Sequence, residues 1–177
     1  MTGTRLSYED SCRRLQQGYR DARGIPPMPD HVPRLDDPEP LGVSFFRTSV
    51  GEGYDLGNLT LPRTFFGRSE IDDASFKNTD LTESNLCWNN FTDVDFTDAV
   101  LARSDLRASL FNRVRFVRAD LRGADLRRSS FDDCLFDDAL MSGVVLTREQ
   151  GRGLKLSEQQ RAAIRWCDDD GPEPEGG

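Results

Sequence analysis

Residues 101–126 read LARSDLRASLFNRVRFVRADLRGADL, and a leucine or phenylalanine stands at every fifth position of this stretch. The same spacing runs without a slip over 19 positions, 17 of them leucine or phenylalanine. A period of five fits neither an α-helix, with a period of about 3.6, nor a β-strand, with a period of about 2. Each five-residue unit therefore forms one side of a coil whose core is completed by neighbouring coils. The positions are Leu56, Leu61, Phe66, Ile71, Phe76, Leu81, Leu86, Phe91, Phe96, Leu101, Leu106, Phe111, Phe116, Leu121, Leu126, Phe131, Phe136, Met141 and Leu146.

A second track of small or compactly branched residues runs two positions before the large ones, with Asn89 as its exception. We expect each small residue to oppose a large one across the bore, because this fills a narrow core without voids. The track comprises Thr64, Ser69, Ala74, Thr79, Ser84, Asn89, Val94, Ala99, Ser104, Ser109, Val114, Ala119, Ala124, Ser129, Cys134, Ala139 and Val144.

The order of the large residues indicates how many sides make one coil. From Leu81 onward they read Leu-Leu-Phe-Phe three times over, which is a repeat of 20 residues. A coil of four sides follows, and residues 20 apart should stack in columns. This register predicts one column of Leu81, Leu101 and Leu121, an opposite column of Phe91, Phe111 and Phe131, and Leu86, Leu106 and Leu126 facing Phe96, Phe116 and Phe136.

Two adjacent units, Ala119–Gly123 and Ala124–Arg128, have the form A(D/N)LXX, which closely resembles the pentapeptide-repeat proteins. The resemblance covers about residues 44–148 and implies an all-β solenoid, a right-handed quadrilateral β-helix of about five coils with short helical caps at both ends. We expect an N-terminal helix and proline-rich lid over residues 1–43, and a helical cap with a disordered acidic tail over residues 149–177. The family fold hosts many roles, so the resemblance is specific for fold rather than for function.

Both ends of the solenoid need a cover, because an open apolar end would associate with other chains. Ser7 with Asp10 predicts a capped helix to about Asp21, followed by an extended loop over the prolines of residues 25–40. The apolar stripe of this predicted helix consists of Tyr8, Cys12, Leu15 and Tyr19. The repeat should begin near Ser44 and Phe46, with Gly51 as a defective inward position.

At the C-terminal end the outward positions become apolar at Leu135, Leu140 and Val145. The segments 147–150 and 157–166 read as short capped helices. We expect them to fold back over the last coil and cover this apolar patch through Leu154, Leu156, Ile164 and Trp166. The alternative is a homodimer through the same end, as the resemblance to C-terminally dimerising, gyrase-binding members implies.

The chain is acidic, with a formal charge of −8 and a pI near 4.7. This charge disfavours nucleic acid or anionic membrane as a direct partner, and fits either a basic protein partner or solubility alone. The sequence has no apolar run of transmembrane length and no signal-peptide profile, so we expect a cytoplasmic protein. Four cysteines far apart fit a reducing compartment, and Cys134 should lie in the core.

The outward positions are the candidates for function, and the 20-residue register places them in columns. One column is Asp73, Asp93, Arg113 and Asp133, and the next is Asn78, Asp98, Arg118 and Asp138. Either the arginines only neutralise the carboxylates, or the acidic face imitates phosphates to a basic partner. Trp88 falls in a third column with Arg68, Ala108 and Arg128, where it is either an interface anchor or stacked on the arginines.

Catalysis finds little support in the residues. His31, the only histidine, lies in the proline-rich loop without an evident partner, and paired aspartates such as Asp72 and Asp73 fit turns better than an acid/base pair. No phosphate-binding loop, nucleophile elbow or zinc signature occurs, so we expect no cofactor and no metal.

Three functions stay open. The first is a non-catalytic inhibitor, in its most concrete form an immunity protein that neutralises a basic partner such as a bacterial nuclease toxin. The second is a DNA-mimicking protector of gyrase or another topoisomerase, of the Qnr and MfpA type. Against it stand the arginine-rich coil of residues 104–123, the short repeat and the long N-terminal lid. The third is a structural scaffold.

Overall fold

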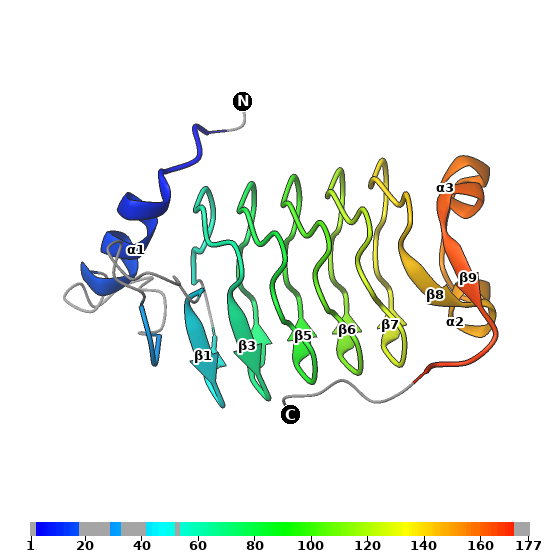
Figure 1. Cartoon of the computed structure of the whole chain (residues 1–177), viewed down its shortest axis with the longest axis horizontal. Helices are drawn as coiled ribbons and strands as arrows, with labels where there is room; N and C mark the ends of the chain where they lie inside the picture. The colour runs from blue at the N-terminus through cyan, green and yellow to red at the C-terminus, as the bar shows by residue number, and fades with distance from the viewer. Residues whose placement is uncertain (1–2, 18–28, 33–41, 52–53, 172–177) are drawn as a thin grey trace.

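The computed structural model describes residues 3–17, 29–32, 42–51 and 54–171 (Figure 1). The described part is a β-solenoid of about six turns with a few short helices, about one turn more than predicted. The helices are α1 (Tyr8–Gln17), α2 (Arg148–Arg152) and α3 (Glu158–Ala163). The strands are β1 (Ser44–Phe46), β2 (Ser49–Val50), β3 (Phe65–Gly67), β4 (Glu70–Asp72), β5 (Asn90–Thr92), β6 (Leu110–Asn112), β7 (Ser130–Asp132), β8 (Val145–Thr147) and β9 (Arg165–Cys167).

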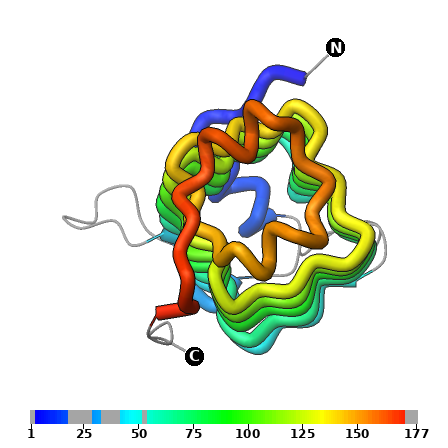
Figure 2. Tube along the Cα trace, turned by 90° about the vertical axis from the view of Figure 1, so that its right-hand side faces the viewer, coloured from blue at the N-terminus to red at the C-terminus, as the bar shows by residue number. Residues whose placement is uncertain are grey.

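Four columns of parallel pairing define the four sides of the coil, and the coils lie over one another when viewed along the axis (Figure 2). One side is the sheet β2-β4-β5-β6-β7, in which Ile71 pairs with Phe91 and Phe111 with Phe131. The other three sides are held mainly by single bridges between residues 20 apart, such as Val100 with Asp120. The register of 20 residues per coil is confirmed.

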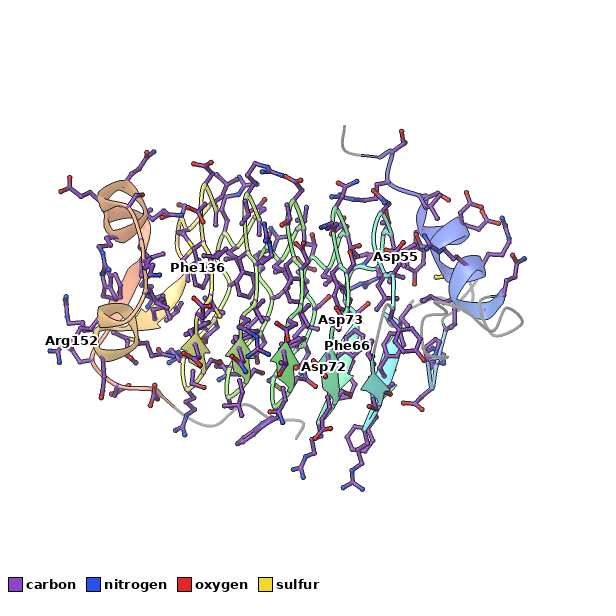
Figure 3. All side chains as sticks on the ribbon, turned by 180° about the vertical axis from the view of Figure 1, so that it is seen from behind. Asp55, Phe66, Asp72, Asp73, Phe136 and Arg152 are labelled. Atoms are coloured by element: carbon purple, nitrogen blue, oxygen red, sulfur yellow. The ribbon has the colours of Figure 1, made fainter. Side chains whose placement is uncertain are left out.

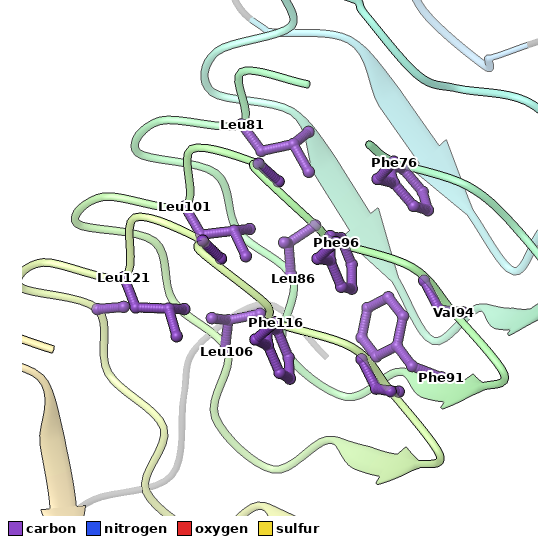
Figure 4. Packing of buried hydrophobic residues seen from close by; sticks show 14 of the residues in the cluster. Phe76, Leu81, Leu86, Phe91, Val94, Phe96, Leu101, Leu106, Phe116 and Leu121 are labelled. Carbon is purple, nitrogen blue, oxygen red and sulfur yellow. The ribbon is translucent and has the colours of Figure 1, made fainter. Parts of the chain in front are cut away.

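Both inward tracks line the bore as predicted. Of the 19 large residues, only Phe131 is more than marginally accessible, and all 17 small-track residues are buried. Leu81, Leu101 and Leu121 stack in one column, and Phe96 and Phe116 stack in another (Figure 4). Phe111 lies between Phe91 and Phe131, with ring centroids 5.0 and 5.2 Å apart. Such stacks fill the bore at the spacing of the β-ladder.

The polar members of the small track also satisfy backbone groups inside the bore. The hydroxyl of Ser109 accepts the N–H of Asn89 at 3.1 Å and donates to the carbonyl of Leu86 at 2.9 Å. Asn89 does the same with a longer side chain, since its Oδ1 accepts the N–H of Ser69 and its Nδ2 donates to the carbonyl of Phe66. At these positions of the small track, serine and asparagine fill the bore and also satisfy buried backbone groups by hydrogen bonding.

The predicted start of the repeat is wrong by one residue. Phe45, rather than Phe46, pairs with Phe66, and Val50, rather than Gly51, pairs with Ile71, whereas Asp55 pairs with Ser75 at the normal interval of 20. One extra residue therefore lies between Val50 and Asp55. The shift places Phe45 and Val50 in the bore in place of Phe46 and Gly51, and it turns Phe46 outward with 43% of its surface exposed.

Helix α1 covers the first coil, beside Asp55 (Figure 3). Leu15 and Cys12 of α1 are buried in the core cluster. The backbone N–H of Thr60 donates to Ser11 Oγ at 2.8 Å, so α1 also satisfies an edge group of the coil. The predicted helix residues after Gln17, and the proline-rich loop except for residues 29–32, lie outside the described residues. His31 is exposed, and its backbone forms an antiparallel bridge with Ser44.

The C-terminal cap closes the other end through two glutamines. Thr147 and Ser157 begin α2 and α3 with capping boxes, as predicted. The predicted helix over residues 157–166 is too long, because α3 ends at Ala163 and Trp166 lies in β9. Gln150 Nε2 donates to the carbonyls of Leu126 and Ser129, and Gln160 Nε2 to those of Phe136 and Ala139. Strand β9 then pairs in parallel with β8, continuing the 20-residue register.

The outward apolar patch at this end is not covered in the way predicted. Leu154 and Ile164 are buried against the core, but Leu140 keeps 50% of its surface exposed. The cap covers the end of the bore, where the open backbone groups and apolar side chains lie, and it leaves the outward position Leu140 exposed. Within the described residues, no helix is both long enough and apolar enough to span a bilayer.

Candidate protein-binding surface

The corner residues are held in a left-handed backbone conformation. At every described corner, the residue two positions after the large inward residue has a φ near +50 to +70°, from Arg47 to Gly143. Aspartate and asparagine tolerate this conformation better than most residues, which accounts for their frequency here. All eight predicted partner-binding residues occupy such corners: Asp73, Trp88, Asp93, Asp98, Arg113, Arg118, Asp133 and Asp138.

Where an aspartate precedes the large inward residue, its carboxylate accepts the backbone N–H of the residue two positions later, just before the corner. Asp95 Oδ1 accepts the N–H of Thr97 at 2.9 Å, and Asp125 Oδ1 accepts that of Arg127 at 3.1 Å. These Asx-type turns explain the acidic position of the A(D/N)LXX unit by backbone satisfaction. The carboxylates concerned are half-buried and serve the fold.

Two of the predicted charge columns are neutralised at their centres. Arg113 donates to both carboxylate oxygens of Asp93, at 2.7 and 2.6 Å, and Arg118 does the same to Asp98, at 2.7 Å each. These hydrogen bonds hold the pKa of the Asp93 and Asp98 carboxyls below their usual range. The structure therefore contains the neutralising ladder at these four positions.

The remaining carboxylates of these columns are displayed to solvent. Asp133 and Asp138 have no ion pair among the described residues, and the same holds for Asp73 near the other end. Asp132 and Asp137 precede them on the same corners and are also exposed. We name Asp132, Asp133, Asp137 and Asp138 the acidic edge, because they flank one side of the same coil. Four exposed negative charges on two rigid corners suit contacts with a cationic surface.

The side that carries Cys87 holds a charge network that the sequence reading missed. Arg107 donates to Asp105 at 2.7 Å and lies 3.7 Å from Asp125, and Arg127 donates to Asp125 at 2.7 Å. All four side chains are half-buried, so this network braces successive coils. The 20-residue register contained the signal, since Asp105 and Asp125 share one column and Arg107 and Arg127 the next.

Trp88 lies at its predicted corner, with 36% of its surface exposed and a φ of 60°. Among the described residues, no arginine stacks on its ring; the arginine–aromatic contact found there is between Arg47 and Phe46, at 5.3 Å. Phe46 and Phe65 lie on the same side and stack at 6.4 Å. Because of the one-residue shift near Gly51, the sequence predicted Phe46 to point inward rather than to be part of this surface.

The described residues bring together no group of three or more histidine, cysteine, aspartate or glutamate side chains that could hold a metal. His31 is exposed at its bridge to Ser44, and Asp72 ends β4 while Asp73 occupies the corner after it (Figure 3). Burial raises the pKa of the Cys12, Cys87 and Cys134 thiols, which lowers their reactivity. The geometry fits the display of fixed side chains to a partner.

Comparisons with known proteins agree with this geometry. The family model "Pentapeptide repeats" matches residues 90–128 with eight copies. No curated protein sequence matches the chain. Among solved structures, HetL of Nostoc sp. strain PCC 7120, involved in regulating heterocyst differentiation, superposes with a TM-score of 0.55 at 17% identity over 58% of this chain and 48% of HetL. The chain thus spans about half the length of HetL.

Rfr23 of Cyanothece 51142 superposes with a TM-score of 0.54 at 19% identity, over 56% of this chain and 80% of Rfr23. A trypsin-treated form of QnrB1, a plasmid-mediated fluoroquinolone resistance protein, is 14% identical over 72% of this chain and 85% of that one, with a TM-score of 0.44. At identities this low, the superpositions on HetL and Rfr23 show a shared fold alone. The family model shows pentapeptide repeats over residues 90–128, and the five-residue spacing and the shared fold extend the same architecture along the described solenoid.

Proposed function

We propose that this protein is a non-catalytic, protein-binding inhibitor whose acidic edge occupies the cationic surface of a nucleic-acid-handling protein. The most concrete form is an immunity-type protein that neutralises a nuclease toxin. The observation that carries the proposal is the set of four exposed carboxylates on the acidic edge, which have no ion pair within the described residues. Elsewhere in the same columns, Arg113 and Arg118 neutralise Asp93 and Asp98.

Rigid display is the mechanism. At the acidic edge, the carbonyls of Asp132 and Asp137 accept the backbone N–H groups of Arg113 and Arg118 from the preceding coil, both at 2.8 Å. The four carboxylates therefore lose little backbone entropy when they contact arginines and lysines of a partner. Negative charge arranged on a fixed frame would speed association with a basic surface and exclude its nucleic acid.

The gyrase-protecting alternative draws less support from this surface. A duplex mimic needs continuous acidity along the rod, and the Asp93–Arg113 and Asp98–Arg118 pairs interrupt it at mid-length. A supercoiling assay separates the two roles, since gyrase activity should be unaffected by micromolar protein if the first proposal is right.

The test is affinity capture from the native host on the immobilised full-length chain. The acidic-edge variant carries asparagine at positions 132, 133, 137 and 138, because asparagine tolerates the left-handed corners. The matched control combines Asp93→Asn, Asp98→Asn, Arg113→Gln and Arg118→Gln, which removes the paired charges and leaves the net charge unchanged.

We expect the wild type and the control to retain a basic nucleic-acid-binding protein that salt or DNA elutes, and the acidic-edge variant to lose it. The captured protein should degrade nucleic acid, and an equimolar amount of the chain should stop the reaction. Equal capture by all three proteins, or a partner without a cationic surface, would contradict the proposal.

A further inference from the structure

A corner column opposite in charge to the acidic edge runs along the chain. We name it the arginine ridge: Arg47, Arg68, Trp88, Ala108 and Arg128, which are successive corners at one edge of the solenoid, and Arg148, the first residue of α2, which continues the 20-residue register. Coils about 4.8 Å apart set the spacing of these side chains. The ridge is cationic on a chain whose formal charge is −8, so it is a distinct surface.

Its N-terminal half combines free cations with exposed rings. Arg68 has no ion pair among the described residues, and Arg47 contacts the ring of Phe46. The rings of Phe46 and Phe65 cover Gly67, where an added Cβ would come within 2.4 Å of Phe65. Glycine at position 67 thus permits two aromatic side chains to lie flat beside the ridge.

Trp88 is not explained by the fold. Its left-handed corner suits aspartate, asparagine or glycine, and the ring gains no deep burial in return, since 36% of its surface is exposed. The left-handed conformation is common to every described corner and does not by itself distinguish Trp88, but a large aromatic side chain left 36% exposed at such a corner does. Tryptophan and arginine are also the residue types that anchor protein interfaces.

The C-terminal half of the ridge already binds an acidic segment, from the same chain. Arg148 pairs with the Asp168 carboxylate at 3.2 Å, and the backbone N–H of Arg128 donates to Asp170 Oδ1 at 3.2 Å. Arg128 Nη2 also donates to the carbonyl oxygen of Gly171 at 2.6 Å. Carboxylates and a main-chain carbonyl of an acidic stretch thus satisfy donors of this column.

We propose that Arg47, Arg68 and Trp88 bind an acidic, extended segment of a partner protein in the same manner. Arg47 and Arg68 pair with its carboxylates, and Trp88 and Phe46 pack against its apolar side chains or proline rings. The protein would then contact a basic partner through the acidic edge and an acidic one through the ridge. Single-stranded nucleic acid also suits rings and arginines, but the charge of −8 repels a long polyanion, and the known occupants of the column are carboxylates.

The probe is a fluorescein-labelled (Glu-Pro)6 peptide, which is acidic and extended, titrated by anisotropy against the full-length chain at low salt. (Lys-Pro)6 reports on binding of the opposite charge, and a dT12 oligonucleotide reports on nucleic acid. The test variants are Trp88→Asn, which suits the left-handed corner, and Arg68→Gln. Ala108→Asn is the matched control, because it makes the same corner change one coil along the ridge.

We expect (Glu-Pro)6 to bind, Trp88→Asn and Arg68→Gln each to weaken binding by about tenfold or more, and Ala108→Asn to leave it unchanged. Trp88→Asn should melt no lower than the wild type, which separates lost contact from lost folding. The proposal is overturned if (Glu-Pro)6 fails to bind at about 1 mM, if (Lys-Pro)6 or dT12 binds better, or if the ridge variants bind as the wild type does. None of these results depends on the acidic edge.

Discussion

Arg113 donates two hydrogen bonds, of 2.7 and 2.6 Å, to the carboxylate of Asp93. Asp93 lies one coil before Arg113 in the same corner column. Arg118 and Asp98 repeat the arrangement on the next corner. Two arginines thus tie neighbouring coils from outside, while the rings of Phe91 and Phe111 stack within. The pairs also divide an acidic surface into two parts, which is why the exposed carboxylates lie towards its ends.

The two pairs predict an acid-dependent loss of stability. Their hydrogen bonds lower the folded-state pKa of Asp93 and Asp98, so their contribution is complete above the ordinary aspartate pKa of about 3.9 and is lost as the pH falls through the lowered values. We expect Arg113→Gln to lower the urea midpoint at pH 7, with a difference from wild type that shrinks towards pH 2. Arg68→Gln, which removes no ion pair within the described residues, should show no such pH dependence. An Arg113→Gln deficit equal at both pH values would contradict this assignment.

Inward and outward positions should differ sharply in their effect on unfolding. Phe111 is buried and stacked on two rings, so Phe111→Ala should cost about 3–5 kcal/mol through the cavity it leaves. Trp88→Ala should cost about 0.5 kcal/mol or less, because the ring is exposed at a corner. Urea unfolding of both variants provides the measurement. Equal losses of unfolding free energy in the two variants would mean that the assignment of inward and outward positions is wrong.

The core was predictable because one physical rule, a large side chain every fifth residue, repeats without interruption from Leu56 to Leu146. The first coil was not, because an extra residue between Val50 and Asp55 shifts the phase and leaves no trace in the spacing after it. Pairing with Phe66 and Ile71 decides that Phe45 and Val50 point inward. Such a choice depends on a neighbouring coil, which a local pattern does not contain.

The role of Asn89 could not be predicted from the size of its side chain. It appeared as an irregular member of the small track, yet its amide donates to the carbonyls of Phe66 and Cys87 and accepts from the N–H of Ser69. Asn89→Leu would leave these three buried groups unpaired, and we expect a loss of about 3–5 kcal/mol. Asn89→Ser should cost less, because serine at the next position of the column, Ser109, accepts the corresponding N–H. Urea unfolding that ranks the serine variant below the leucine variant would refute this role.

The candidate surface was predictable in position but not in pairing. The 20-residue register placed all eight candidate residues on corners, because the spacing alone fixes which residues face outward. The partner of each charge depends on side-chain geometry, so the sequence left open whether Arg113 and Arg118 neutralise their columns. It also left Phe46 out of the surface, because the residue's direction follows from the shifted first coil.

The cysteines should differ in reactivity. Cys12, Cys87 and Cys134 are buried, and Cys167 is partly exposed on β9 with its thiol directed to the carbonyl of Leu146 at 3.3 Å. Burial raises the pKa of all four thiols, so reaction at neutral pH is slow and limited by access. We expect N-ethylmaleimide to modify Cys167 first, as read by peptide mass spectrometry, and Cys167→Ser to remove the early phase. Modification of Cys134, which lies on the small inward track, at the same rate in the native protein would contradict the burial of the bore.

The C-terminal glutamines give the clearest test of the cap. Gln160 Nε2 donates to the carbonyls of Phe136 and Ala139, while Gln159, its neighbour on the same short helix, is exposed and forms no side-chain hydrogen bond within the described residues. Gln160→Leu would leave two edge carbonyls of the last coil unpaired and should lower stability by about 2–4 kcal/mol.

An unsatisfied coil edge is also a template for pairing with another chain, so Gln160→Leu should raise the apparent mass in size-exclusion chromatography as concentration rises. Gln159→Leu adds the same apolar side chain one residue away without releasing a carbonyl, and should melt and elute as the wild type does. If both leucine variants associate equally, added surface hydrophobicity explains the effect, and the glutamine cap does not protect the end of the solenoid.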